Sequence, residues 1–82
     1  MSYDKVKQAN SCRVGLKQTL KSIEQKEVDE VIVAQDAEQA IIQKILLVCQ
    51  KNDIPVSYVD SMRKLGKTCG IDVGAAVVSI KR

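Results

Sequence analysis

Short apolar runs alternate along this chain with segments of helical periodicity. The clearest run is the β-branched stretch at residues 31–34, which is typical of a strand buried on both faces. Leu16, Leu20 and Ile23 recur at the spacing of one helix face, so we expect a helix to begin near Leu16. The two patterns together indicate a protein that contains both helices and strands.

The rest of the chain continues this alternation. It predicts short helices over residues 3–10 and 61–69, a longer one after residue 36, and strands over residues 12–14, 56–59 and 75–80. Strands that alternate with helices favour β-α-β crossovers and a sheet covered on both faces. We therefore predict a single domain, residues 1–82, of α/β class: a three-layer α/β/α sandwich with a mixed, mostly parallel four-stranded sheet.

Two aspartates follow predicted strands directly. Asp36 precedes Gln39 by three residues, which resembles a capping box at the start of the long helix. Asp60, or Ser61 beside it, is placed to cap the short helix that stops at Gly70. Because open α/β sheets bind ligands beyond their strand ends, both carboxylates are also candidate ligand-binding groups. The sequence favours capping and leaves the second possibility open.

Composition restricts the class of protein. Phe and Trp are absent and hydrophobic residues make up 45% of the chain, so the core must be aliphatic. No apolar run approaches the roughly 18–20 residues of a membrane span, so we expect a cytoplasmic protein without a membrane partner. Three cysteines without any histidine exclude the usual zinc spacings and argue against a disulfide scaffold. No catalytic or nucleotide-binding motif is present, and we expect neither enzymatic activity nor a metal or cofactor.

Charge is unevenly distributed, although the net charge is only +3. Residues 5–26 contain six basic side chains and one acid, whereas residues 27–38 contain five acids and no base. Basic residues also gather at positions 63, 64 and 67. Such segregation can place a basic patch for an anionic partner on one side of the fold, but solvated helix faces give the same pattern and are its more common cause.

The junction between the first strand and the helix after it has the chemistry to bind a polyanion. Gly15 opens the helix, where unpaired backbone N–H groups attract anions and the lack of a Cβ permits close approach. Lys17 and Lys21 are four residues apart, and both lie near Gln18, whose amide can donate to and accept from a base edge. Many helices begin in this way, so the arrangement is weak by itself.

The loop Ile71-Asp72-Val73 places two aliphatic side chains between Gly70 and Gly74. Such side chains either tuck into the core or pack against a partner. The sequence does not decide between these two possibilities.

These pieces together resemble the family of ribosomal proteins named L-seven-Ae and L-thirty-e, and most closely its short bacterial YbxF-like members. The likeness covers about residues 12–80 and rests on four motifs in order. They are Gly15 with Lys17, Gln18 and Lys21; the run from Val31 to Glu38; Ile54-Pro55-Val56; and Leu65 to Gly70 followed by Ile71-Asp72-Val73.

The resemblance implies a protein that binds kink-turns, which are RNA duplexes bent at a bulge and followed by tandem sheared G·A pairs. The bend opens a major groove that A-form RNA normally closes to side chains. In the family, positions matching Lys17, Gln18 and Lys21 contact guanine edges and phosphate. The loop Ile71-Asp72-Val73 matches the segment that covers the bulge. The family's pocket for an extruded base corresponds to Glu38, Ile42 and Met62.

Two positions depart from the family pattern. Lys17 stands in place of Asn, and Gln18 in place of Glu. Glutamine keeps an acceptor without the charge, whereas lysine cannot accept a hydrogen bond at all. We therefore expect fewer guanine contacts and stronger attraction to phosphate.

The sequence thus predicts a monomeric RNA-binding protein that stabilises kink-turns and associates with the ribosome, with ribosomal RNA or with a structured leader such as a riboswitch. Two alternatives stay open. One is a ribosome-associated protein that binds ribosomal RNA without kink-turn selectivity. The other is a protein-interaction or small-ligand α/β domain.

Overall fold

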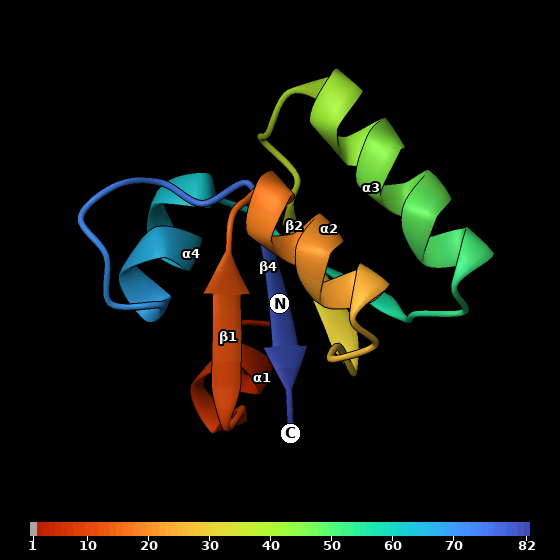
Figure 1. The fold of residues 1–82 in the computed structure, drawn as a ribbon. Helices are drawn as coiled ribbons and strands as arrows, with labels where there is room; N and C mark the ends of the chain where they lie inside the picture. The colour runs from red at the N-terminus through yellow and green to blue at the C-terminus, as the bar shows by residue number, and fades with distance from the viewer. Residues whose placement is uncertain (1) are drawn as a thin grey trace.

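The computed structural model describes residues 2–82, in which helices and strands alternate along the chain (Figure 1). The elements are α1 (Tyr3–Gln8), β1 (Ser11–Val14), α2 (Leu16–Glu24), β2 (Glu30–Ala34), α3 (Gln39–Lys51), β3 (Val56–Val59), α4 (Met62–Thr68) and β4 (Val77–Lys81). Every element expected from the hydrophobic pattern is present, so the α/β class is confirmed.

The sheet lies between two helical layers. One hydrophobic cluster, around Ile32 and Leu65, lies under α1 and α4, and a second, around Val31 and Ile45, lies under α2 and α3. Successive residues of β2 point alternately into the two clusters, and all five of its residues are buried. The three-layer α/β/α sandwich is therefore confirmed.

The strand order β1-β4-β2-β3 corrects the expectation of a mostly parallel sheet. Only β2 and β3 pair in parallel, while β4 pairs antiparallel with both β1 and β2. Three strands do run in one direction, as the alternation with helices predicts. The last strand enters between β1 and β2 in the opposite direction, so adjacent pairs are mostly antiparallel.

One buried carboxylate, that of Glu30 at the start of β2, ties distant parts of the chain together. Its oxygens accept from Lys5 Nζ at 2.8 Å and from Arg82 Nη2 at 2.7 Å, and the Ser57 hydroxyl also donates to it. Burial alone raises the pKa of Glu30, but the hydrogen bonds from Lys5, Ser57 and Arg82 outweigh it and lower that pKa to about 2. Glu30 thus stays ionised and connects α1, β3 and the C-terminal end of β4.

The three cysteines are free thiols. Cys49 is buried in α3, and burial raises its pKa to about 11. Cys12 and Cys69 are far apart in sequence, yet both are half-buried against the cluster under α1 and α4. Burial and the neighbouring Cys12 thiol raise the pKa of Cys69 to about 11. The thiols of Cys49 and Cys69 are therefore protonated packing groups at neutral pH.

Candidate nucleic-acid interface

The sheet topology brings the residues expected to bind RNA to one edge of the fold. Strands β1, β2 and β3 run in the same direction, so the segments that follow them leave from the same edge. Gly15 follows β1, Glu38 lies beyond β2, and Met62 follows β3. Because β4 is antiparallel to β1 and β2, the loop of residues 69–76 enters it from that edge too (Figure 1).

Gly15 is the N-cap residue of α2 and has a φ of 100°, a conformation that L side chains rarely adopt. Its N–H donates to Val77 O at 2.8 Å, and its carbonyl accepts from Thr19 N at 3.0 Å. A Cβ at this position would meet no atom within 4 Å. Backbone conformation therefore selects glycine here, and the start of α2 stays open to an approaching partner.

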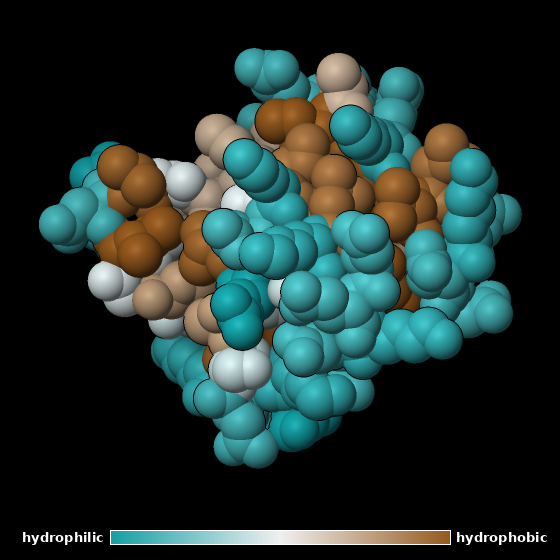
Figure 2. All heavy atoms as spheres, viewed as in Figure 1, coloured by the Kyte–Doolittle hydropathy of each residue, from teal (hydrophilic) through white to brown (hydrophobic). Residues whose placement is uncertain are grey.

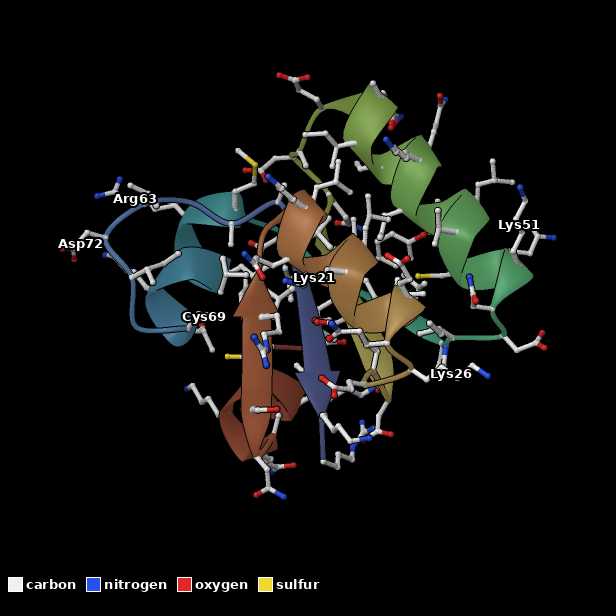
Figure 3. The ribbon with its side chains drawn as sticks, in the orientation of Figure 1. Lys21, Lys26, Lys51, Arg63, Cys69 and Asp72 are labelled. Atoms are coloured by element: carbon white, nitrogen blue, oxygen red, sulfur yellow. The ribbon has the colours of Figure 1, made fainter. Side chains whose placement is uncertain are left out.

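The side chains of Lys17, Gln18 and Lys21 are all exposed on α2. Thr19, Ser22 and Ile23 form the buried face of the same helix. The exposed polar side chains thus lie off the packed face, as the periodicity predicts, and Figure 3 labels Lys21 beside α2. This surface offers two cations and an amide beside the free end of the helix.

Asp36 does not cap the helix that follows it, so the expected capping box is wrong. The N-cap residue of α3 is Glu38, and its side chain makes no capping hydrogen bond. Asp36 Oδ1 instead accepts from Met62 N at 2.8 Å, at the first residue of α4. Asp36 thus accepts a hydrogen bond from α4 and none from the start of α3. This contact ties the β2–α3 turn to α4.

Of the two residues expected to cap α4, Ser61 caps the helix and Asp60 has other partners. Ser61 is the N-cap residue of α4, and its hydroxyl accepts from Lys64 N at 3.2 Å. Asp60 accepts from the Tyr3 hydroxyl and forms an ion pair with Lys64 Nζ at 3.4 Å. The Tyr3 hydrogen bond holds the pKa of Asp60 below its ordinary value. Capping is therefore confirmed for Ser61, whereas Asp60 bonds Tyr3 and Lys64 and does not cap the helix.

The loop between α4 and β4 is fixed against α4 by backbone contacts. Ile71 N donates to Gly66 O at 3.0 Å, and Ala75 N donates to Met62 O at 2.9 Å. A Cβ on Gly66 would lie 2.0 Å from Val73 O, a distance that real atoms do not tolerate. Gly66 therefore permits the loop backbone to lie directly on the helix.

The side chains of residues 71–73 differ in solvent exposure. Ile71 is half-buried against the cluster under α1 and α4, whereas Asp72 is exposed and Val73 is 69% exposed. Figure 2 shows hydrophobic atoms at the surface on the left, where this loop lies. Of the two possibilities left open for the loop, Ile71 takes the first, and Val73 is free to contact a partner.

The residues expected to line a base pocket do not enclose one. Glu38 is exposed at the start of α3, while Ile42 and Met62 are half-buried. Across residues 2–82 no pocket is present, and no group of three potential metal-ligating side chains occurs there. These three side chains therefore form part of an open surface.

Comparison with known proteins identifies the family. The sequence profile of the ribosomal protein L7Ae/L30e/S12e/Gadd45 family matches residues 2–82. The chain belongs to this family. Over the full length of both chains it is 55% identical to an RNA-binding protein of Halalkalibacterium halodurans and 50% identical to the RNA-binding protein YbxF of Geobacillus stearothermophilus. The expected resemblance to YbxF-like members is thereby confirmed.

A solved structure extends the likeness of this L7Ae-family chain to eukaryotes. The 15.5kD RNA binding protein of Giardia lamblia superposes with a TM-score of 0.85 at 28% identity, covering 98% of this chain and 70% of that one. The two chains therefore share the same fold. In the part of the chain that the structure describes, no helix is long and apolar enough to cross a membrane.

Sequence reasoning missed two contacts at this edge of the L7Ae-family fold, that of Asp36 with Met62 and that of Gly66 with the loop. The tertiary partner of Asp36 has no local signal, because Met62 lies 26 residues away. Gly66 did have a signal, since a glycine inside a helix is unfavourable unless packing requires it. Its role in holding the loop depends on the position of Val73 O, which no local pattern predicts.

Proposed function

We propose that this chain is an RNA-binding protein that recognises kink-turns and stabilises their bent form. One observation carries the proposal: the open start of α2 and the exposed Val73 loop share one edge of the sheet. Relatives named as RNA-binding proteins, aligned over the full chain, support an RNA partner.

The proposed recognition uses the residues of that edge. Gly15 gives the RNA backbone access to the start of α2, and Lys17 and Lys21 supply cations for phosphate or for guanine acceptors. Gln18 reads a guanine edge of the sheared G·A pairs through its amide. The contacts act in the major groove that the kink opens.

The loop and the starts of α3 and α4 contact the bulge. The loop Ile71-Asp72-Val73 covers the bulged nucleotides with the exposed Val73 side chain. Glu38, Ile42 and Met62 contact an extruded base on the open surface between the starts of α3 and α4. A base has a π-face that aliphatic and thioether groups can pack against.

The activity is selection of a conformer, not catalysis. A protein that binds the bent RNA more tightly than the extended one shifts the population toward the bend by the difference in affinity. Ribosomal RNA and riboswitch leaders are the proposed targets, with the monomer as the binding unit and ribosome association as the cellular setting.

The deciding experiment titrates the purified protein against a labelled kink-turn RNA and against the same RNA with both G·A pairs replaced by Watson–Crick pairs, at two salt concentrations. We expect tight, salt-sensitive binding that is lost on replacement of the G·A pairs. Equal affinity for both RNAs would reduce the function to general RNA binding. Binding to ribosomal subunits without kink-turn selectivity would then favour the ribosomal alternative.

Gln18→Ala tests the residue proposed to read the base pairs, with Gln43→Ala on the exposed side of α3 as its control. Loss of one good base contact reduces discrimination by about 1–3 kcal/mol. The Gln18 variant should therefore lose preference for the G·A-containing RNA, while the Gln43 variant keeps it. Unchanged discrimination in the Gln18 variant would remove this residue from the recognition scheme.

A further inference from the structure

Two cations on α4 make no side-chain hydrogen bond or ion pair within residues 2–82, and the RNA contacts described above do not use them. Arg63 and Lys67 are four residues apart, so they lie on the same side of this helix. Both are exposed, and within residues 2–82 neither forms an ion pair. Lys64 on the same helix differs, because it pairs with Asp60.

The position of these cations relative to the loop is defined by Gly66. The loop backbone contacts α4 at Gly66, beside Val73 O, and at Met62, whose carbonyl accepts from Ala75 N. Arg63 precedes Gly66 by about one turn of the helix and Lys67 follows it directly, so both cations lie within about one turn of the place where the loop meets α4. Figure 3 shows Arg63 and Asp72 on this side of the molecule and Lys51 of α3 on the opposite side.

We propose that Arg63 and Lys67 form a phosphate-binding surface that extends the RNA contact from the loop onto α4. This inference rests on the proposed kink-turn function. An RNA strand that passes over Val73 must continue past the loop, and its phosphates then face the two cations. The guanidinium of Arg63 can hold one phosphate through two parallel hydrogen bonds, and the Lys67 ammonium acts as a point charge.

The charge on this surface fits a polyanion better than an acidic protein patch. Asp72 is the one acid among residues 61–76, and it accompanies exposed Val73 at the loop tip. Two cations separated by one helical turn, beside an exposed aliphatic side chain, suit a nucleic-acid strand that alternates phosphates with bases. The proposed occupant is therefore the backbone of the RNA strand at the bulge.

The test compares three proteins for binding to one kink-turn RNA over a range of salt concentration. They are the unmodified chain, the R63Q/K67Q variant, and the control variant K44Q/K51Q, which removes two exposed cations from α3. Each lost phosphate contact reduces the slope of log affinity against log salt by roughly one. We expect the slope to fall by about two and affinity at 0.1 M salt to fall at least about tenfold in R63Q/K67Q alone.

Retention of the slope in a charge-preserving R63K/K67R variant would support a phosphate contact. If R63Q/K67Q and K44Q/K51Q have the same slope as the unmodified chain, the inference is overturned, although the kink-turn function stands. If the unmodified chain fails to distinguish the G·A-containing RNA from its Watson–Crick control, the proposed function fails, and this extension fails with it. The comparison of protein variants therefore tests this inference, and the comparison of the two RNAs tests the proposed function.

Discussion

The Asp36 carboxylate accepts a hydrogen bond from the backbone N–H of Met62, 26 residues later in the chain, at 2.8 Å. This contact joins the turn after β2 to the first residue of α4, and both segments border the proposed RNA site. The N–H of a first helical residue has no partner within its own helix. Asp36 therefore satisfies a group that the helix itself leaves unpaired.

Replacement of Asp36 tests that link. Loss of a carboxylate acceptor at a helix start typically destabilises a protein by about 1 kcal/mol. We expect Asp36→Ala to lower the free energy of unfolding by about that amount, and Asp36→Asn, which keeps an acceptor, to lower it less. Urea denaturation measures the difference. Equal losses in the two variants would show that the hydrogen bond is not the source of the effect.

Gly66 makes a sharper steric prediction. A Cβ there would lie 2.0 Å from Val73 O, so Gly66→Ala must displace the loop or the helix. We expect a loss of about 1–3 kcal/mol of stability, as for other overpacking substitutions, and weaker RNA binding. Gly74→Ala is the matched control, because its Cβ would lie 3.3 Å from Met62 Cβ and needs only a small adjustment. Equal RNA affinity of the two variants at a temperature where both are folded would contradict the proposed positioning of the loop.

The ionisation of Glu30 should govern stability in acid. Its pKa falls from an ordinary value of 4.5 to about 2 in the folded protein. A depressed carboxyl pKa contributes stability that is present above pH 4.5 and is lost as the pH falls toward 2. A difference of this size corresponds to roughly 3 kcal/mol. Denaturation between pH 2 and pH 6 measures it.

Glu30→Gln provides the comparison for that experiment. The variant should be less stable at neutral pH, because Lys5 and Arg82 lose their carboxylate. Its stability should also depend less on pH between about 2 and 4.5, the interval over which Glu30 takes up its proton. The same pH dependence in both proteins would assign the acid sensitivity to other carboxylates.

The thiols supply a prediction about reactivity. Alkylating reagents attack the thiolate, and burial raises the pKa of Cys49 and of Cys69 to about 11. At pH 8 the thiolate fraction of these residues is then about a hundredfold lower than that of a thiol of pKa 9. We expect slow labelling of both in the folded chain and fast labelling in urea. Mass spectrometry after peptide digestion identifies the modified positions, and rapid labelling of folded Cys49 would contradict its burial.

The elements of the fold were predictable because each depends on local patterns. The β-branched run of β2 and the spacing of Leu16, Leu20 and Ile23 determine a strand and a helix over a few residues. The position of β4 between β1 and β2 was not predictable in this way. Strand order depends on contacts between residues far apart in the chain, such as Val14 with Val78.

The same distinction between local patterns and long-range contacts applies to the candidate site. Gly15 and the exposed side chains of α2 follow from one short stretch of sequence, and the structure places them where the pattern indicates. Asp36 satisfied a local capping pattern with Gln39, yet its partner is the more distant Met62. A sequence motif names the groups that can bond, whereas packing decides which donor reaches the acceptor.

The place of β4 in the sheet also affects how the chain can fold during synthesis. It lies between β1 and β2 but follows every other helix and strand in sequence. Until residues 77–81 have been synthesised, β1 has no neighbouring strand to pair with, and β2 lacks one of its two partners. Cooperative folding, and with it any competence to bind RNA, must therefore wait for the last strand and cannot proceed gradually from the N-terminus.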